Sequence, residues 1–155
     1  MHPHPVRTFP INLMLAGRPV LVVGGGKVAE RKIERLTAAG ATVRVTSPVV
    51  RPLLEQSAQA GTLTLERRPF NAVTDLDRAP RPLLVYIATD DHDVNRTVID
   101  ECRTRGIICC AVDEQWTSGD FLTPASAEVD GLMLSVATQG RSCSRARLVK
   151  ESMAR

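Results

Sequence analysis

A short run of glycines carries the clearest chemical pattern in the sequence. The segment from Gly24 to Ala29 reads Gly-Gly-Gly-Lys-Val-Ala and matches the pattern Gly-x-Gly-x-x-Ala. In this pattern Gly24 permits a tight turn after a strand, Gly26 lets a pyrophosphate approach the backbone, and Ala29 lets the following helix pack closely. The free N–H groups and the dipole of that helix attract phosphates. The residues predicted to bind a dinucleotide are Gly24, Gly25, Gly26, Lys27 and Val28.

The segment after the second expected strand lacks the acidic residue that usually grips the cofactor ribose. Thr46, Ser47 and Pro48 occupy that place. We assign Ser47 and Pro48 to the cofactor site, with Ser47 donating a hydrogen bond to the ribose. Because Arg44 and Arg51 lie nearby in the sequence, a 2′-phosphate is also compatible with this segment, and the residues alone leave the choice between NAD and NADP open.

Polar residues follow the buried strand expected at 83–88, where Thr89 and Asp90 come next in the chain. Ligands of open α/β sheets bind beyond the carboxyl ends of the strands, so we assign Thr89 and Asp90 to the cofactor site. Asn95, one helical turn further on, is predicted to face the same crevice and to contact a substrate. The alternative, which we expect to hold for at least one residue of Thr89-Asp90-Asp91, is a helix N-cap, because Thr and Asp side chains both accept backbone N–H bonds.

A further carboxylate, Asp113, directly follows the strand expected at 107–112. Beside a nicotinamide it would serve as a general base or bind a metal. The alternative is a cap or a solvated loop acid, which is also what its neighbour Glu114 is expected to be. We predict that Asp113 is the catalytic residue.

These side chains need a sheet whose strands end at one edge. Short apolar runs alternate with helical stretches that end at Gly40, Gly61 and Gly106. This alternation predicts an α/β fold, a Rossmann-like parallel sheet with helices on both faces. Residues 68–82 contain three prolines and are expected to be mainly loop. The expected strands cover 19–23, 42–46, 62–66, 83–88 and 107–112, and the expected helices cover 27–39, 50–60 and 91–105.

The pattern changes after Asp113. Asp130-Gly131 lies between extended segments at 126–129 and 132–138, which predicts a two-residue hairpin, and 144–153 reads as a helix. We therefore divide the chain into a Rossmann-like nucleotide-binding domain, 1–113, and a short antiparallel appendage, 114–155.

Composition excludes several classes of protein. The net charge is only +3 and aromatic residues make up 3%, without the basic stripe and stacking aromatics of a nucleic-acid binder. No apolar run is long enough to span a membrane, and the first seven residues lack the apolar stretch of a signal peptide, so we expect a cytoplasmic protein. The four cysteines form no Cys-x-x-Cys pair, so we expect buried thiols and neither a metal site nor a disulfide framework.

Together these motifs resemble one family, that of precorrin-2 dehydrogenase/sirohydrochlorin ferrochelatase, which includes the N-terminal module of bacterial sirohaem synthase. The resemblance runs from about Phe9 to the C-terminus with the same order and spacing of motifs. The matching pieces are Phe9-Pro10 with Leu13 and Leu15, Gly17 to Ala29, Arg31-Lys32 with Leu36, Val45 to Pro48, Ala88 to Asp91 with Asn95, Val112-Asp113, Phe121 to Ala125, and Leu134 to Thr138.

The resemblance implies NAD as cofactor and the oxidation of precorrin-2 to sirohydrochlorin. Some members also insert ferrous iron into the tetrapyrrole, a ferrochelatase reaction. The residue matching Asp113 is implicated in catalysis, and in chelation where that occurs, and Thr138 matches a position near the tetrapyrrole. Members are homodimers built through the region after the Rossmann part, so 114–155 is expected to serve dimerisation and substrate binding.

Several residues depart from the family pattern. Cys110 stands where Asn is common, Gln139 replaces the first of two glycines, and Cys143 replaces a proline. The chain reaches Arg155, where the family usually continues into a helical domain, so the C-terminal region is expected to be shortened.

Two alternatives to the enzyme remain. One is a non-catalytic nucleotide-binding Rossmann module, and the other is a tetrapyrrole-carrying protein derived from the enzyme. Under the simplest reading, the glycine turn merely links a strand to a helix. Arg141, Arg145 and Arg147 either meet the carboxylates of a tetrapyrrole or form a solvated helix face.

Overall fold

The computed structural model describes residues 7–112 and 116–154, and it contains two compact units. One unit comprises Leu13–Asp120, and the other comprises Phe121–Arg155 together with the N-terminal residues up to Asn12. The predicted division fell at Asp113, whereas the two units separate after Asp120. The segment before Asp120 stays with the first unit because it is tied to Cys109: the Asp120 N–H donates to the Cys109 carbonyl oxygen at 2.7 Å, and the Cys109 N–H donates to Asp120 Oδ2 at 2.8 Å.

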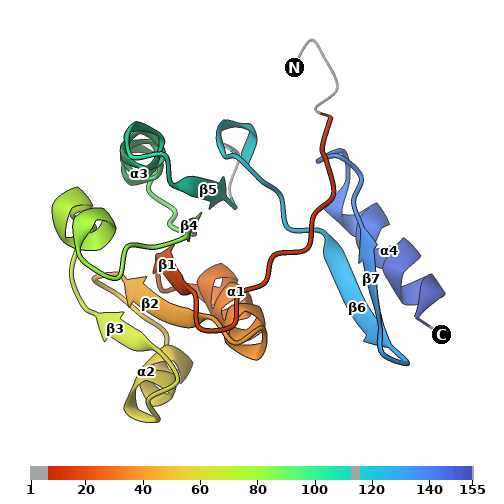
Figure 1. Cartoon of the computed structure of the whole chain (residues 1–155), viewed down its shortest axis with the longest axis horizontal. Coiled ribbons are helices and arrows are strands. Elements are labelled where there is room, and N and C mark those ends of the chain that lie inside the picture. Colours follow the sequence, from red (N-terminus) through yellow and green to blue (C-terminus); the bar gives the residue numbers. More distant parts are fainter. Residues whose placement is uncertain (1–6, 113–115, 155) are drawn as a thin grey trace. The chain divides into compact units, whose positions relative to one another are not determined.

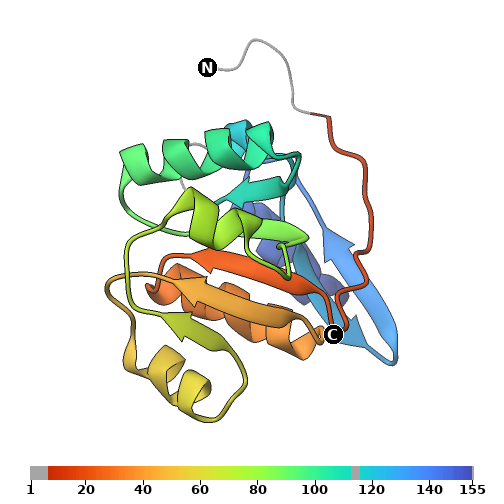
Figure 2. The ribbon, with the colours of Figure 1, turned by 60° about the vertical axis from the view of Figure 1, so that its left-hand side comes forward.

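The first unit is built on a five-stranded parallel sheet, as the alternation of strands and helices predicted (Figure 2). The strand order is β3-β2-β1-β4-β5, which places β1 at the centre, with β2 and β4 as its neighbours. The carboxyl ends of β1, β2 and β4 therefore meet at one edge of the sheet. The strands are β1 (Pro19–Val23), β2 (Thr42–Thr46), β3 (Thr64–Glu66), β4 (Leu84–Ile87) and β5 (Ile108–Ala111).

Helices cover both faces of this sheet, and Figure 1 shows α1 and α3 on opposite sides of it. Successive residues of a strand point to opposite faces, so each strand supplies both layers of the core. Leu21 of β1 belongs to the apolar cluster that contains Val98 of α3, while Lys32 of α1 lies over the ring of Tyr86 on the other face, 5.3 Å from its centroid. The helices of this unit are α1 (Lys27–Ala38), α2 (Pro52–Gln59) and α3 (His92–Thr104).

The segment expected to be mainly loop, 68–82, contains a short π-helix, η1 (Val73–Asp77). The prediction was incomplete here because the three prolines obscured what holds this segment. Leu76 of η1 is fully buried in the apolar cluster under α3, and Asp75 is fully buried among polar partners. A second short element, the 3-10 helix η2 (Trp116–Ser118), precedes the end of the first unit.

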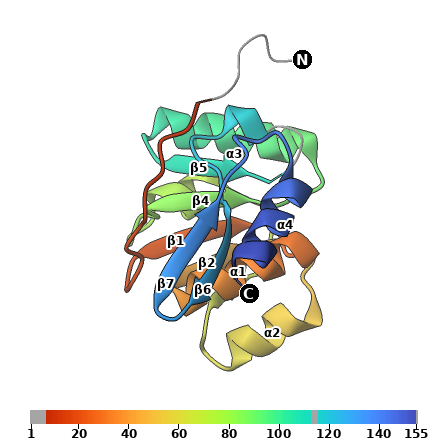
Figure 3. The ribbon, with the colours of Figure 1, turned by 90° about the vertical axis from the view of Figure 1, so that its right-hand side faces the viewer.

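The second unit consists of a hairpin and one helix, which lie side by side in Figure 3. The hairpin pairs β6 (Ala125–Val129) with β7 (Leu132–Val136), and the helix is α4 (Cys143–Met153). Asp130 and Gly131 form the turn, with φ values of 51° and 76°. Both lie in the left-handed region that a two-residue turn of this kind requires, so the predicted hairpin is confirmed.

Candidate functional site

The glycine turn joins β1 to α1, and its first glycine is fixed by the neighbouring strand. Gly24 has a φ of 116°, and its N–H donates to the Thr46 carbonyl oxygen of β2 at 3.0 Å. A Cβ atom on Gly24 would overlap the carbonyl oxygen of Ala88 at the end of β4. Gly24 is therefore required by the close approach of three strand ends, in agreement with the tight turn predicted there.

The second glycine is required by the protein, but the third is not. A Cβ on Gly25 would lie 2.5 Å from the Val49 carbonyl oxygen, so the loop after β2 packs directly on this residue. Gly26 has a φ of −82°, which any residue adopts, and apart from its chain neighbours no atom of the described residues lies within 4 Å of where its Cβ would be. Nothing in the described protein thus explains a glycine at position 26. A ligand that approaches the backbone does explain it.

Helix α1 begins directly after this open position. Gly26 is the N-cap residue and has no side chain with which to cap the helix, and Lys27 and Val28 are exposed. The N–H groups of a first helical turn point out of the helix end and attract anions. Ala29 is fully buried, which allows α1 to lie close to the sheet, as predicted. These residues fit the diphosphate of a dinucleotide.

The end of β2 offers the ribose fewer donors than the sequence suggested. Ser47 is buried, and its hydroxyl donates to the Val49 carbonyl oxygen at 2.7 Å. The expected donation from Ser47 to a ribose is therefore not available in this structure, and its oxygen is left as an acceptor. Pro48 is exposed beside it.

The two arginines considered for a 2′-phosphate have different surroundings. Arg44 is largely buried and donates to the carbonyl oxygens of Thr74 and Asp75 in η1. Arg51 is half-exposed, and its Nε donates to Glu30 Oε2 at 2.9 Å. Of this pair, Arg51 is the one that stays accessible at the glycine turn.

The end of β4 is held by hydrogen bonds between Thr89 and Asn95. The Thr89 hydroxyl donates to Asn95 Oδ1, and Asn95 Nδ2 donates to the Thr89 carbonyl oxygen at 3.0 Å. Asn95 is completely buried, which argues against the predicted contact with a substrate and gives it the role of positioning Thr89. Asp91, rather than Thr89 or Asp90, is the N-cap of α3 and accepts from the N–H groups of Asp93 and Val94. Asp90 is exposed at the edge of the sheet.

Asp113, the predicted catalytic residue, lies outside the described residues. Val112, the residue before it, donates its N–H to the Ile87 carbonyl oxygen of β4 at 3.1 Å. Asp113 is the next residue in the sequence after this bond.

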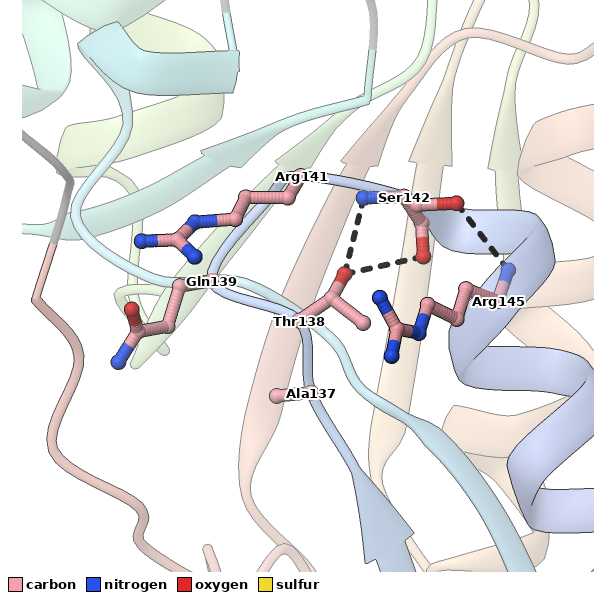
Figure 4. A pocket seen from close by; sticks show the side chains of 6 residues that line it. All are labelled: Ala137, Thr138, Gln139, Arg141, Ser142 and Arg145. Atoms are coloured by element: carbon pink, nitrogen blue, oxygen red, sulfur yellow. Dashed lines mark hydrogen bonds between the residues drawn. The ribbon is translucent and has the colours of Figure 1, made fainter.

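Thr138 lines a pocket of about 460 Å³ in the second unit. Its hydroxyl donates to the Ser142 carbonyl oxygen at 2.9 Å and accepts from the Ser142 N–H at 3.0 Å, so it closes the turn before α4. Figure 4 shows Arg145 extending from α4 toward Thr138, whereas Arg141 and Gln139 extend from the loop on its other side. Gln139 has a φ of 53°, which explains why the family pattern has glycine at this position.

A buried carboxylate that the sequence did not reveal supports the end of β2. Asp75 accepts hydrogen bonds from Thr46 Oγ1 at 2.9 Å and from the Asn71 N–H at 2.8 Å, and both of its oxygens accept from Arg68. Burial favours a higher pKa for Asp75, but the hydrogen bonds from Arg68, Asn71 and Thr46 outweigh it and lower the pKa below its ordinary value. The hydrogen bonds of Arg68 to Asp75 raise the pKa of Arg68, burial opposes this, and its bond to Glu66 adds to the rise. The sequence offered little signal for this carboxylate, because Asp75 stands between Thr74 and Leu76 and its partner on β2, Thr46, is 29 residues away.

Three of the four cysteines lie in the core, as the sequence predicted. Cys102, Cys109 and Cys110 are buried free thiols, as expected, whereas Cys143 is exposed at the start of α4, so the expectation of burial is wrong for it. In the part of the chain that the structure describes, no helix is both long and apolar enough to cross a membrane.

Known proteins share this arrangement of glycine turn and parallel strands. A family model described as "Putative NAD(P)-binding" matches residues 11–125, about three quarters of the chain. The chain belongs to this NAD(P)-binding family. The chain is 36% identical over 145 residues to "Siroheme synthase 1" of Serratia proteamaculans (strain 568). It is 39% identical over 145 residues to "Siroheme synthase" of Enterobacter sp. (strain 638).

These alignments cover 94% of this NAD(P)-binding chain but 29% and 31% of the two relatives, so the chain spans less than a third of their length. Among solved structures, "SirC, precorrin-2 dehydrogenase" superposes with a TM-score of 0.80 at 26% identity, covering 94% of this chain and 69% of that one. The Rossmann-like fold and the family resemblance predicted from the sequence are both confirmed.

Proposed function

We propose that this protein oxidises precorrin-2 to sirohydrochlorin with NAD as the hydride acceptor. The observation that carries the proposal is the open position in front of Gly26, where the protein itself gives no reason for a glycine. The similarity to siroheme synthases and to SirC, precorrin-2 dehydrogenase, supports precorrin-2 as the substrate.

Different residues of this chain would bind the cofactor and transfer the proton in such a reaction. The N–H groups at the start of α1 hold the diphosphate, and Gly26 leaves room for it. Thr89, fixed by Asn95, and Asp90 border the cofactor at the end of β4. When bound, NAD supplies the hydride acceptor. Asp113 is the proposed general base and accepts a proton that the substrate loses as it gives up the hydride.

The pocket in the second unit is the proposed site for carboxylates of the tetrapyrrole. Arg141 and Arg145 line it, and Thr138 fixes the turn that carries Arg141 and leads into α4, which carries Arg145. Guanidinium groups are suited to carboxylates because they offer several donors in a planar fork.

Replacing Arg145 with Gln should therefore weaken substrate binding. We expect KM for precorrin-2 to rise by about tenfold or more with kcat little changed, because a lost charged hydrogen bond of this kind acts on substrate and transition state alike. Lys150→Gln removes the same charge from α4 outside the pocket and should leave KM unchanged. Steady-state kinetics on both variants measure this, and an unchanged KM in Arg145→Gln would exclude that arginine from the substrate site.

The second unit is also the proposed surface of a homodimer. Four large apolar side chains on β7 and α4 are more than half exposed, and exposed apolar surface often marks an interface between proteins. They are Leu132, Met133, Leu148 and Met153. Sedimentation equilibrium should give the mass of a dimer, and the mass of a monomer would refute this assignment.

The location of the protein in the cytoplasm, expected from the sequence, stays a prediction.

The direct test of the proposed function is a spectrum of the protein with precorrin-2 and NAD. We expect the absorbance of NADH and of sirohydrochlorin to appear together. Gly26→Val is the matched control: its side chain would occupy the open space, so NAD binding should be lost, while the cost at this N-cap position should be only about 1 kcal/mol. Binding of the tetrapyrrole without NADH formation would instead favour a carrier, and binding of nucleotide alone would favour a sensing module.

A second arm of the same experiment adds ferrous iron to sirohydrochlorin. The proposed ferrochelatase activity predicts sirohaem faster than its spontaneous formation, whereas equal rates would limit the protein to the oxidation.

A further inference from the structure

Arg51 connects the loop after β2 to the glycine turn through both its backbone and its side chain. Its N–H donates to the Gly25 carbonyl oxygen at 3.0 Å, and its Nε donates to Glu30 Oε2 at 2.9 Å. Glu30 lies in the first turn of α1, and its own N–H donates to the Gly26 carbonyl oxygen at 3.0 Å. The ion pair therefore lies beside the turn proposed to hold the diphosphate.

This position matters because dinucleotide sites of this fold choose their cofactor beyond the end of the second strand. An acid there grips the ribose 2′-hydroxyl of NAD, whereas an arginine nearby accommodates the 2′-phosphate of NADP. Here Thr46 is bound to Asp75, and the Ser47 hydroxyl donates to a backbone oxygen. Arg51 is the one charged residue in the sequence from 47 to 51.

The ion pair is exposed enough to open. The side chains of Arg51 and Glu30 are 51% and 21% exposed, and an ion pair at a surface holds its partners weakly. A phosphate is a stronger partner for a guanidinium than an exposed carboxylate, because it is doubly charged and accepts two parallel hydrogen bonds. Glu30 opposes this exchange in two ways, since it competes for Arg51 and repels a second anion.

We propose that Glu30 sets the cofactor preference of this site by holding Arg51. With the pair closed, the charge of Arg51 is neutralised and NAD is preferred. With Glu30 removed, Arg51 is free to hold the 2′-phosphate of NADP. This inference rests on the proposed function, because it concerns the same nucleotide site.

Calorimetric titration of NAD and NADP into the intact protein tests the proposal. In Glu30→Gln we expect the affinity for NADP to rise about tenfold while the affinity for NAD changes less than about twofold. Adding Arg51→Leu to that variant should cancel the gain. Any residue except proline keeps the backbone bond to Gly25, so the loop should stay in place. Glu55→Gln is the matched control. It removes an acid of α2 that is paired with Arg67, and it should leave both affinities unchanged.

The outcomes separate this proposal from the one on which it rests. If the wild-type protein binds neither nucleotide, the proposed function fails. If it binds NAD and Glu30→Gln has the same ratio of affinities, or if Arg51→Leu does not cancel a gain, the role of Glu30 is refuted while the proposed function stands.

Discussion

Replacing Asp113 with Asn should lower kcat for precorrin-2 oxidation by about 10²- to 10⁴-fold, the range over which a general base contributes. The amide has the size of the carboxylate but cannot accept the proton that the substrate loses. The affinity for NAD should be unchanged, because the residues proposed to hold the cofactor follow β1, β2 and β4 or begin α1, whereas Asp113 follows β5. Single-turnover measurement of NADH formation, with calorimetry for NAD, checks both parts.

Glu114→Gln is the control for this prediction, since it removes the neighbouring acid of the same segment. It should retain turnover within about a factor of three of the wild-type protein, the scale of a surface change without a role. If Asp113→Asn turns over at the wild-type rate, another group accepts the proton. If Asp113→Asn also loses NAD binding, the residue supports the cofactor site and its assignment as a base is wrong.

The elements around the glycine turn could be predicted because their signals are local. β1 and β2 have the predicted bounds, and α1 ends one residue earlier than expected. An apolar strand followed by glycines and an amphipathic helix leaves little freedom in the type or order of elements. The sequence could also give the reason for Gly24, since a turn at a positive φ must occur there.

The hydrogen-bond partners of polar side chains could not be predicted in the same way. The sequence suggested that Asn95 faces a crevice, but the Thr89 hydroxyl and carbonyl group lie close enough to bind its side chain, and burial follows. Ser47 was expected to donate to the ribose, but the backbone oxygen two residues later accepts its proton instead. In both cases the sequence identified a polar side chain near the strand ends. It did not identify the hydrogen-bond partner of that side chain within the protein, because the fold determines it.

The largest omission was Asp75, because its partners come from β2 and from the segment before η1. Thr46, at the end of β2, is 29 residues away in sequence, and no pattern of spacing links the two. Through this bond, a segment expected to be loop fixes the strand end from which the Ser47–Arg51 loop departs. The end of β2 beside the proposed cofactor site is thus supported by η1.

Replacing Asp75 with Ala should destabilise the fold by about 3–5 kcal/mol, the usual cost of leaving one partner of a buried ion pair without the other. Arg68 would lose both hydrogen bonds to the carboxylate, and Thr46 and the Asn71 N–H would lose their acceptor. Urea denaturation measures the free energy of unfolding. Asp77→Ala, which removes a more exposed acid of the same element that pairs with Arg81 and Arg105, is the control and should cost clearly less than Asp75→Ala. A loss of less than 1 kcal/mol in Asp75→Ala would contradict the assigned role.

The same carboxylate should make stability depend on pH in a defined direction. The pKa of Asp75 is lowered in the folded protein, so the unfolded chain binds this proton more readily. Its contribution is therefore fully present above the ordinary Asp pKa of about 3.9 and is lost as the pH falls from there through the lowered folded value. Asp75→Asn, which keeps the size of the side chain, should remove that part of the acid dependence, so its stability should fall less steeply than that of the wild-type protein below about pH 5. Equal slopes in the two proteins, measured by urea denaturation from pH 3 to 7, would show that Asp75 is not the group whose protonation weakens the fold.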